Sequence, residues 1–345
     1  MRRRQQPPLP KRYGLDPARL RLPAEGDWPS LREHLIDRLP RVEPDRIDEM
    51  LRAGEIVDLD GPLGPDAPYV PGGAVWFHRD LPAEHPVPFD IPIVYRDDTI
   101  LVADKPHFLA TIPRGSHILQ TALVRLRREL DLPDLIPAHR LDRATAGLVL
   151  FVIDPASRGA YQTMFQRQHV RKEYEAVAGY RPELEFPLEL ASRIIKEKHV
   201  LAAQEVPGPP NARTRIELVE RRDALARYRL HPATGRTHQL RLHMNSLGIP
   251  ILGDDFYPVI TDKQLDDYRR PLQLLAATLE FTDPRTGELR RFETTRALQA
   301  WTDPGGWAAG PPATEHPVAP ARRHAGRPAP DHSGERARNH SGRPA

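Results

Sequence analysis

Residues 139–151, HRLDRATAGLVLF, hold the side chains with the clearest chemical potential, because they place one acid, Asp142, in a basic and apolar run. Arg140 and Arg143 flank this acid, and the apolar residues 148–152 follow it. The pattern predicts a carboxylate on the loop that enters a buried strand. Nearby guanidinium groups lower a carboxylate pKa, so Asp142 would serve as a nucleophile or an anchor and not as a proton donor. The residues alone also fit an exposed arginine–aspartate pair ahead of a core strand, which is the commoner arrangement.

The segments around this loop alternate between strand and helix patterns. Extended segments are expected at 93–95, 99–103 and 173–179, and helices at 119–130, from 155 onward and at 237–247. In the third extended segment Glu173 and Glu175 share one face, so Tyr174 should point inward. A plain core tyrosine would show the same pattern. Arg236 stands at the entrance to the last helix, where the default interpretation is a surface or phosphate-binding arginine.

The histidines of the chain do not have the spacing of a metal site. His238 and His243 are five residues apart, whereas two ligands on one helical face are four apart. The chain also has no cysteine, which excludes disulfides and thiolate metal centres. We therefore expect no metal and no cofactor.

Composition indicates a soluble, intracellular protein with a polyanionic partner. The 345 residues carry a net charge of +3 and the sequence pI is about 9.2. Apolar runs are far shorter than the roughly 20 residues that span a bilayer, and no hydrophobic segment follows the basic start. We expect neither a membrane anchor nor a signal peptide, and a cytoplasmic location.

Both ends of the chain have compositions that disfavour a packed core. Residues 1–23 begin with arginines and prolines, and we expect a basic flexible arm that either binds RNA phosphates or is merely solvated. Residues 301–345 are rich in Pro, Gly, Ala and Arg, and we expect a disordered tail.

Residues 24–88 predict a small separate unit. Ser30 and Glu33 fit a capping box that opens a helix through Leu39. A second helix should begin at Pro44 and end at Gly54. Residues 55–59 and 74–78 have strand patterns.

The catalytic candidates belong to a longer resemblance. HRLDRATAGLVLF resembles the HRLD-x-x-T-S-G-L motif of the RluA family of RNA pseudouridine synthases. Four further stretches resemble the other landmarks of that family in order: 94–106, 172–176 (KEYEA), 232–257 (beginning PATGRTHQLRLH) and 274–284. The match spans roughly residues 90 to 295. Ala146 stands where the family usually has serine, which leaves the local hydrogen bonding of that loop open.

The resemblance implies roles for individual residues. Asp142 would be the catalytic aspartate, with Arg236 as its ionic partner. Tyr174 would lie against the target base, and Arg140 would fill the space of a flipped nucleotide or hold it. His139, Lys172 and Arg241 are candidates for RNA contacts, although ordinary solvated charge is as good an explanation for the two basic side chains.

The resemblance also implies an α+β fold, with a mixed, mainly antiparallel central sheet flanked by helices and loops, in a catalytic domain over residues 89–300. The implied reaction is the isomerisation of uridine in rRNA or tRNA by a monomer. A catalytically retired RNA-binding or assembly protein on the same fold is the main alternative. A carboxylate-dependent glycosidase is another, with Asp254 and Asp255 as available acids.

The unit at 24–88 resembles the small RNA-binding domain named after a ribosomal small-subunit protein. Its predicted helices carry several acids, including Asp45, Asp48 and Glu49, and acids bind phosphate poorly. A docking or spacer role without RNA contact therefore stays open.

Overall fold

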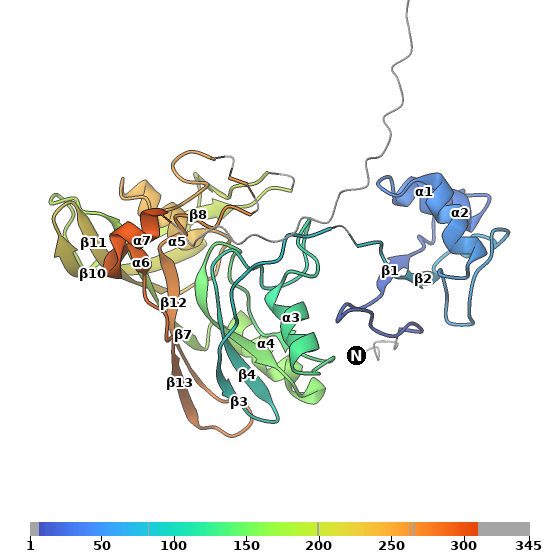
Figure 1. Ribbon diagram of the computed structural model, residues 1–345, viewed down its shortest axis with the longest axis horizontal. Coiled ribbons are helices and arrows are strands. Elements are labelled where there is room, and N and C mark those ends of the chain that lie inside the picture. Colours follow the sequence, from blue (N-terminus) through green and yellow to red (C-terminus); the bar gives the residue numbers. More distant parts are fainter. Residues whose placement is uncertain (1–6, 82, 199, 262, 265, 310–345) are drawn as a thin grey trace, which may run out of the picture. The chain divides into compact units, whose positions relative to one another are not determined.

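The computed structural model describes residues 7–309 apart from 82, 199, 262 and 265 (Figure 1). Eleven strands form one sheet in the order β3-β4-β6-β12-β7-β11-β10-β8-β9, with β13 beside β12 and β5 beside β6. Among the described strands only β6 and β12 pair in parallel. The predicted mixed, mainly antiparallel sheet is confirmed. The strands are β3 (Ile93–Arg96), β4 (Ile100–Lys105), β5 (Ile136–Pro137), β6 (Ala146–Val152), β7 (Val170–Gly179), β8 (Leu188–Ile195), β9 (Gln204–Val206), β10 (Ala212–Arg222), β11 (Leu225–Pro232), β12 (Leu274–Thr282) and β13 (Leu289–Glu293).

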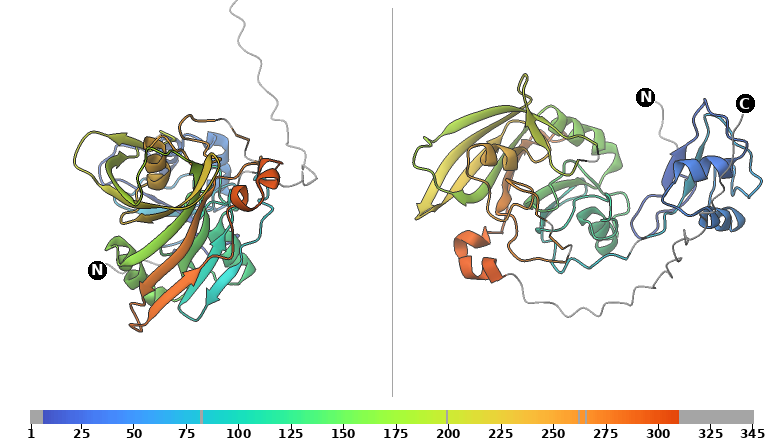
Figure 2. Two further views of the ribbon diagram at one scale, coloured as in Figure 1. Left: turned by 90° about the vertical axis from the view of Figure 1, so that its left-hand side faces the viewer. Right: turned by 90° about the horizontal axis from the view of Figure 1, so that it is seen from above.

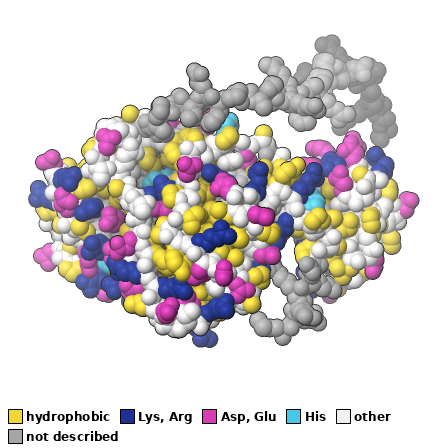
Figure 3. Space-filling model, turned by 60° about the horizontal axis from the view of Figure 1, so that its bottom comes forward, with side chains coloured by type: hydrophobic (Ala, Val, Ile, Leu, Met, Phe, Trp, Pro, Cys, Tyr) yellow, Lys and Arg dark blue, Asp and Glu magenta, His cyan; other side chains and the backbone are white. Residues whose placement is uncertain are grey.

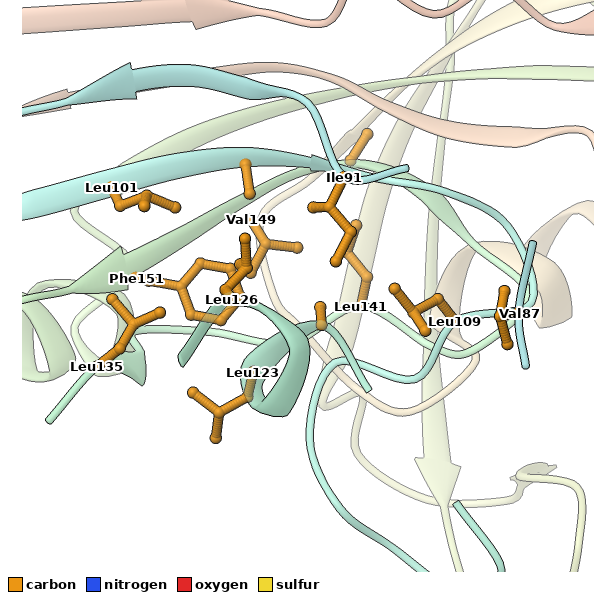
Figure 4. Close-up of a cluster of buried hydrophobic side chains, with 13 residues drawn as sticks. Val87, Ile91, Leu101, Leu109, Leu123, Leu126, Leu135, Leu141, Val149 and Phe151 are labelled. Carbon is orange, nitrogen blue, oxygen red and sulfur yellow. The ribbon is translucent and has the colours of Figure 1, made fainter. Parts of the chain in front are cut away.

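The apolar run after Asp142 forms β6, whose seven residues are all buried. Side chains alternate across a strand, so Val149 and Phe151 join a cluster with Leu123 and Leu126 of helix α3 (Ala122–Glu129) (Figure 4). Leu148 and Leu150 face the other way, toward helix α4 (Arg158–Gln166). Each such buried side chain contributes about 1.5–3 kcal/mol. This strand therefore anchors the loop that carries Asp142.

The other half of the sheet carries the second part of the site. Strands β10 and β11 form a long antiparallel hairpin (Figures 1 and 2). Helix α5 (Gln239–Ser246) packs Leu240 and Met244 against Tyr228 and Leu230 of β11. The predicted helix at 237–247 is thus present but shorter at its start, because His238 has a left-handed backbone.

Residues near the N-terminus form a small unit with its own hydrophobic cluster. It contains β1 (Ala18–Arg21), α1 (Leu31–Arg38), α2 (Pro44–Arg52) and β2 (Ala74–Phe77), and β1 pairs with β2 in antiparallel fashion. Ser30 caps α1 as expected, since its hydroxyl accepts the N–H of Glu33. The predicted strand at 55–59 is reduced to isolated bridges of Val57 with Pro62 and Trp76. The boundary at residue 88 stays a prediction.

Two predicted flexible ends include ordered residues. The arm at 1–23 contains β1, which is held in place by its partner strand, and residues 1–6 lie outside the described part. Residue 301 is not part of a disordered segment, because Trp301 is buried among Val177, Leu275 and Leu298. Helices α6 (Gln299–Thr302) and α7 (Pro304–Ala309) follow the sheet, and the remainder of the predicted tail, 310–345, lies outside the described residues.

Along the described ranges, no helix has the length and apolar character required to cross a bilayer.

The remaining short element is a 3-10 turn, η1 (Pro155–Ser157), which Asp154 caps by accepting the N–H of Ala156.

Candidate active site

A cavity of about 620 Å³ opens where the Asp142 loop meets the start of α5. All seven site residues predicted from the sequence line this cavity: His139, Arg140, Asp142, Lys172, Tyr174, Arg236 and Arg241. They come from the loop before β6, from β7 and from the segment that leads into α5. Residues up to about 100 positions apart in the chain therefore share one site.

Hydrogen bonds from the segment after β4 hold the Asp142 loop. Thr111 uses its hydroxyl twice, donating to the carbonyl of Leu141 (2.8 Å) and accepting the N–H of the same residue (3.1 Å). His107 Nδ1 lies 2.7 Å from the carbonyl oxygen of Ala144. Buried backbone groups require such partners. The loop is consequently fixed on both sides of Asp142.

Lys105 lies beneath this loop and is fully buried. Its ammonium donates to the carbonyl oxygens of Pro106 (2.9 Å), Leu109 (2.8 Å) and, more weakly, Arg143 (3.5 Å). Burial lowers the pKa of Lys105 to about 7, although the charge of Asp142 favours the protonated form. This lysine, which belongs to the 94–106 stretch, thus holds the segment after β4 and the Asp142 loop together.

Asp142 keeps its carboxylate open to the cavity, with 36% of the side chain exposed. Nε2 of His238 lies 4.0 Å from Asp142 Oδ2. The predicted ion pair with Arg236 is not among those formed within the described ranges. Arg236 is exposed at the cavity rim and donates from Nε to the carbonyl of Asn211 (3.1 Å).

Arg241 is buried at the edge of the cavity and bound to acids. Only 2% of its side chain is exposed, and it pairs with Asp254 (Nε to Oδ2, 2.8 Å) and Asp255 (Nη2 to Oδ1, 2.7 Å). Burial would lower the pKa of Arg241, but the hydrogen bond and charge of Asp254 raise it. Nε and Nη2 are thus engaged by carboxylates, and an RNA contact by Arg241 stays a prediction. An arginine–carboxylate pair is thus formed by Arg241, five residues after Arg236 in the chain.

His238 is a functional candidate that the sequence did not single out, since its residue type and spacing indicated only that it is not part of a metal site. Its backbone is left-handed, with φ of 56° and ψ of 17°, which is uncommon outside glycine. Nδ1 lies 3.0 Å from the hydroxyl of Tyr257, and that hydroxyl donates to the carbonyl of Ala203 (2.8 Å). Burial lowers the pKa of His238, while the charge of Asp142 opposes that change.

Tyr174 and His139 form apolar walls of the cavity. Tyr174 packs against the hydrophobic clusters on both sides of the site, and burial raises the pKa of its hydroxyl, as does the charge of Asp142. His139 stacks on Phe165 with ring centroids 4.4 Å apart, and its Nε2 accepts the N–H of Leu150 (3.1 Å). Burial lowers the pKa of His139 to about 3, so the ring is neutral.

Positive charge dominates the cavity lining. Figure 3 shows basic and acidic side chains interspersed over one face of the protein. The cavity differs, because five arginines and one lysine line it with a single carboxylate, Asp142. Burial lowers the pKa of the lysine, Lys172. Among the described residues, no group of three or more histidine, aspartate or glutamate side chains could hold a metal ion.

Comparisons with known proteins agree on one family. Residues 99–246 match the family model described as RNA pseudouridylate synthase. The chain is 31% identical over 222 residues to the dual-specificity RNA pseudouridine synthase RluA of Haemophilus influenzae, covering 59% of this chain and 91% of that protein. Its identity to the Escherichia coli protein of the same name is 35% over 207 residues, covering 58% and 91%.

A solved structure shows the same fold. Human RNA pseudouridylate synthase domain containing 1 superimposes with a TM-score of 0.51 at 24% identity. The alignment covers 64% of this chain and 90% of that protein.

Proposed function

Because the chain belongs to the RluA family of RNA pseudouridine synthases, we propose that Asp142 is the carboxylate with which it isomerises uridine in ribosomal or transfer RNA. As a member of this family the protein is an isomerase that converts uridine to pseudouridine in RNA. The open questions concern which residues perform the reaction and which RNA is modified.

One observation carries the assignment of Asp142. Among the described residues that line the cavity, it is the single carboxylate, and it is partly exposed there. The reaction breaks the bond between N1 of uracil and C1′ of ribose, turns the base and joins C5 to C1′. A carboxylate can attack the sugar or the base, or remove a sugar proton, and every one of these routes needs it ionised beside the nucleotide.

The same observation disfavours a glycosidase. Hydrolysis of a glycosidic bond ordinarily needs two carboxylates on either side of that bond. Asp254 and Asp255 do not line the cavity, and both are paired with Arg241. A single open carboxylate in a basic cavity supports isomerisation of a nucleotide bound through its phosphates.

The cavity lining also suits a uridine that has left its base stack. Extruding a base costs a few kcal/mol, which contacts in the pocket must offset. The exposed guanidinium of Arg140 has no hydrogen bond or ion pair to another described residue, so it is available to fill the vacated stack. Tyr174 offers its ring to the base, and Lys172 and Arg236 offer positive charge to phosphates.

We further propose that the protein acts as a monomer, in the cytoplasm where ribosomal and transfer RNA are found. Light scattering on the protein with and without RNA tests the first part. A stable dimer whose dissociation abolishes activity would contradict it.

The decisive experiment measures tritium release from unmodified ribosomal and transfer RNA labelled at C5 of uracil. Wild-type protein is compared with Asp142→Asn, which keeps the size of the side chain but removes its charge. The matched control is Asp98→Asn, because Asp98 is exposed and lies outside the cavity.

We expect release by the wild type and by Asp98→Asn, and none by Asp142→Asn. Release by Asp142→Asn at the wild-type rate would overturn the assignment of Asp142. Binding of RNA without release by any of the three proteins would favour the retired RNA-binding protein.

A further inference from the structure

The hydrogen bonds of His238 determine which of its nitrogens carries the proton. The hydroxyl of Tyr257 has one proton, and it donates that proton to the carbonyl of Ala203. A carbonyl only accepts, so toward His238 the Tyr257 oxygen must accept in turn, and Nδ1 must be its donor. In a neutral imidazole the other nitrogen is then an acceptor. Nε2 therefore presents a lone pair.

That lone pair lies in the cavity beside the catalytic carboxylate. Nε2 of His238 is 4.0 Å from Asp142 Oδ2, and both residues line the cavity. The separation is too long for a direct hydrogen bond and leaves the nitrogen available to a bound nucleotide. The left-handed backbone at φ 56° aims the ring in this direction. Strained backbone of this kind often accompanies a functional site.

We propose that His238 is the base that removes the C5 proton in the last step of the isomerisation. The inference rests on the proposed role of Asp142. After C5 has joined C1′, it carries both the ribose and its original hydrogen. On every route open to Asp142 its carboxylate lies beside the nucleotide that contains C5, and Nε2 of His238 lies 4.0 Å from that carboxylate, so the C5 proton lies within reach of Nε2.

The step is balanced without any further reactant. Nε2 takes the proton from C5, and the electrons of that C–H bond form the C5–C6 double bond. The π electrons of the former C6–N1 double bond move onto N1, and N1 takes a proton from water. The imidazolium returns its proton to water, and the product is an isomer of the substrate.

The surroundings of His238 keep it neutral and ready to accept a proton. Charged or titratable groups that face it are Asp142, Arg241, Asp254, Asp255 and Tyr257. Burial is the largest influence and lowers the pKa of His238 below its usual value. The two acids beyond Asp142 are already paired with Arg241, which limits their pull on the imidazole.

Two substrates separate this step from the earlier ones. Uridine labelled with tritium at C5 must lose its label to give product. In 5-fluorouridine C5 holds fluorine in place of hydrogen, so cleavage and rejoining can occur without removal of a proton from C5, and water adds across the C6–N1 double bond to complete the rearranged nucleoside. A residue that serves only the last step should affect the first substrate and spare the second.

His238→Asn is the variant of choice, because asparagine tolerates a left-handed backbone and its side-chain amide can replace the Nδ1 hydrogen bond to Tyr257. It lacks a group at the Nε2 position. His238→Gln places an amide nearer that position, but an amide is not a base. The matched control is His231→Asn, since His231 lies on β11 outside the cavity.

With tritiated uridine RNA we expect both His238 variants to release label about 10²–10⁴-fold more slowly than the wild type. With 5-fluorouridine RNA they should form the rearranged nucleoside at the wild-type rate, as followed by nuclease digestion and chromatography. His231→Asn should match the wild type on both substrates. Deuterium at C5 should slow His238→Asn more than it slows the wild type.

Equal slowing of both substrates would overturn the inference, because it would show that His238 positions Asp142 and is not a base. Unchanged tritium release would overturn it as well, because it would show that Asp142 or water removes the C5 proton. Asp142→Asn separates the two assignments, since it should abolish the conversion of both substrates. Conversion by that variant would be a failure of the proposed function and not of the role of His238.

Discussion

Arg241 and Asp254 form an ion pair that is nearly sealed from water, with 2% and 1% of their side chains exposed. Asp254 also accepts the N–H groups of Phe256 and Tyr257, so the pair fixes the turn that holds His238. Removing one partner of a buried pair leaves an uncompensated charge and costs about 3–5 kcal/mol. We expect Arg241→Met to lower the free energy of unfolding in urea by this amount.

The control is an exposed pair from the same part of the chain. Arg269 pairs with Asp267 at 2.9 Å, but 66% of the Arg269 side chain is exposed. Exposed pairs contribute at most about 1 kcal/mol, so Arg269→Met should change stability little. Similar losses in the two variants would show that burial of the Arg241 pair has no special importance.

Arg140 should matter for activity on structured RNA and not for stability. It is exposed and makes no hydrogen bond or ion pair with another described residue, so Arg140→Ala should change the free energy of unfolding by no more than about 0.5 kcal/mol. If the guanidinium replaces an extruded base, kcat/KM should fall about tenfold or more on a stem-loop. The loss should be smaller on an unstructured oligonucleotide, where no stack is broken.

Arg96→Ala provides the comparison for Arg140, because Arg96 is equally exposed but lies on β3, away from the cavity. It should retain wild-type activity on both RNAs. An equal loss for Arg140→Ala on the two RNAs would point to a simple phosphate contact.

The neutral state of His139 predicts a loss of stability in acid. The pKa of His139 is lowered to about 3 in the fold, from 6.5 for an ordinary histidine. Between these values the unfolded chain binds the extra proton, so stability falls as the pH drops from about 6.5, by up to about 1.4 kcal/mol per pH unit. Urea unfolding of the wild type and of His139→Gln at pH 7.5 and 4.5 should reveal a smaller loss in the variant. Identical losses would mean that His139 does not control this titration.

Much of the site could be predicted because its signals are local. The apolar run of β6 and the acid before it stand next to each other in the sequence, and alternation along β7 turns Tyr174 inward. The resemblance to the family then predicted that residues from three separate segments share one site, and these residues line one cavity. Trp301 shows the opposite case, since the Pro- and Gly-rich residues around it concealed a side chain that packs on the sheet.

The division of tasks between Arg236 and Arg241 could not be predicted. Both arginines stand near the start of one short helix, and only the tertiary position of Asp254 decides which of them becomes buried. Histidine adopts a left-handed backbone more often than most residues do, but still too rarely for the sequence to predict it at His238. Its tautomer depends on Tyr257 and Ala203, which lie 19 and 35 positions away in the sequence and meet it only after folding.

Gly147 explains why glycine occupies its position in the motif around Asp142. It lies on β6 opposite Ala276 of β12 in the one parallel pairing among the described strands. Its φ is +111°, and a Cβ there would lie 2.3 Å from the carbonyl oxygen and 2.6 Å from the nitrogen of Ala276. Both contacts are with backbone atoms, which cannot rotate away as a flexible side chain would. Any larger residue must separate β6 from β12.

Gly147→Ala should therefore lower the free energy of unfolding by at least about 2 kcal/mol, from crowding and from the strained backbone together. Because the Asp142 loop leads directly into this strand, tritium release should fall as well at temperatures where the variant is still folded. Gly159→Ala is the matched control: Gly159 lies in α4 with open space around it, so alanine should leave stability unchanged or raise it by up to about 1 kcal/mol. If Gly147→Ala were as stable and active as that control, the close approach of β6 and β12 would not be what fixes the catalytic loop.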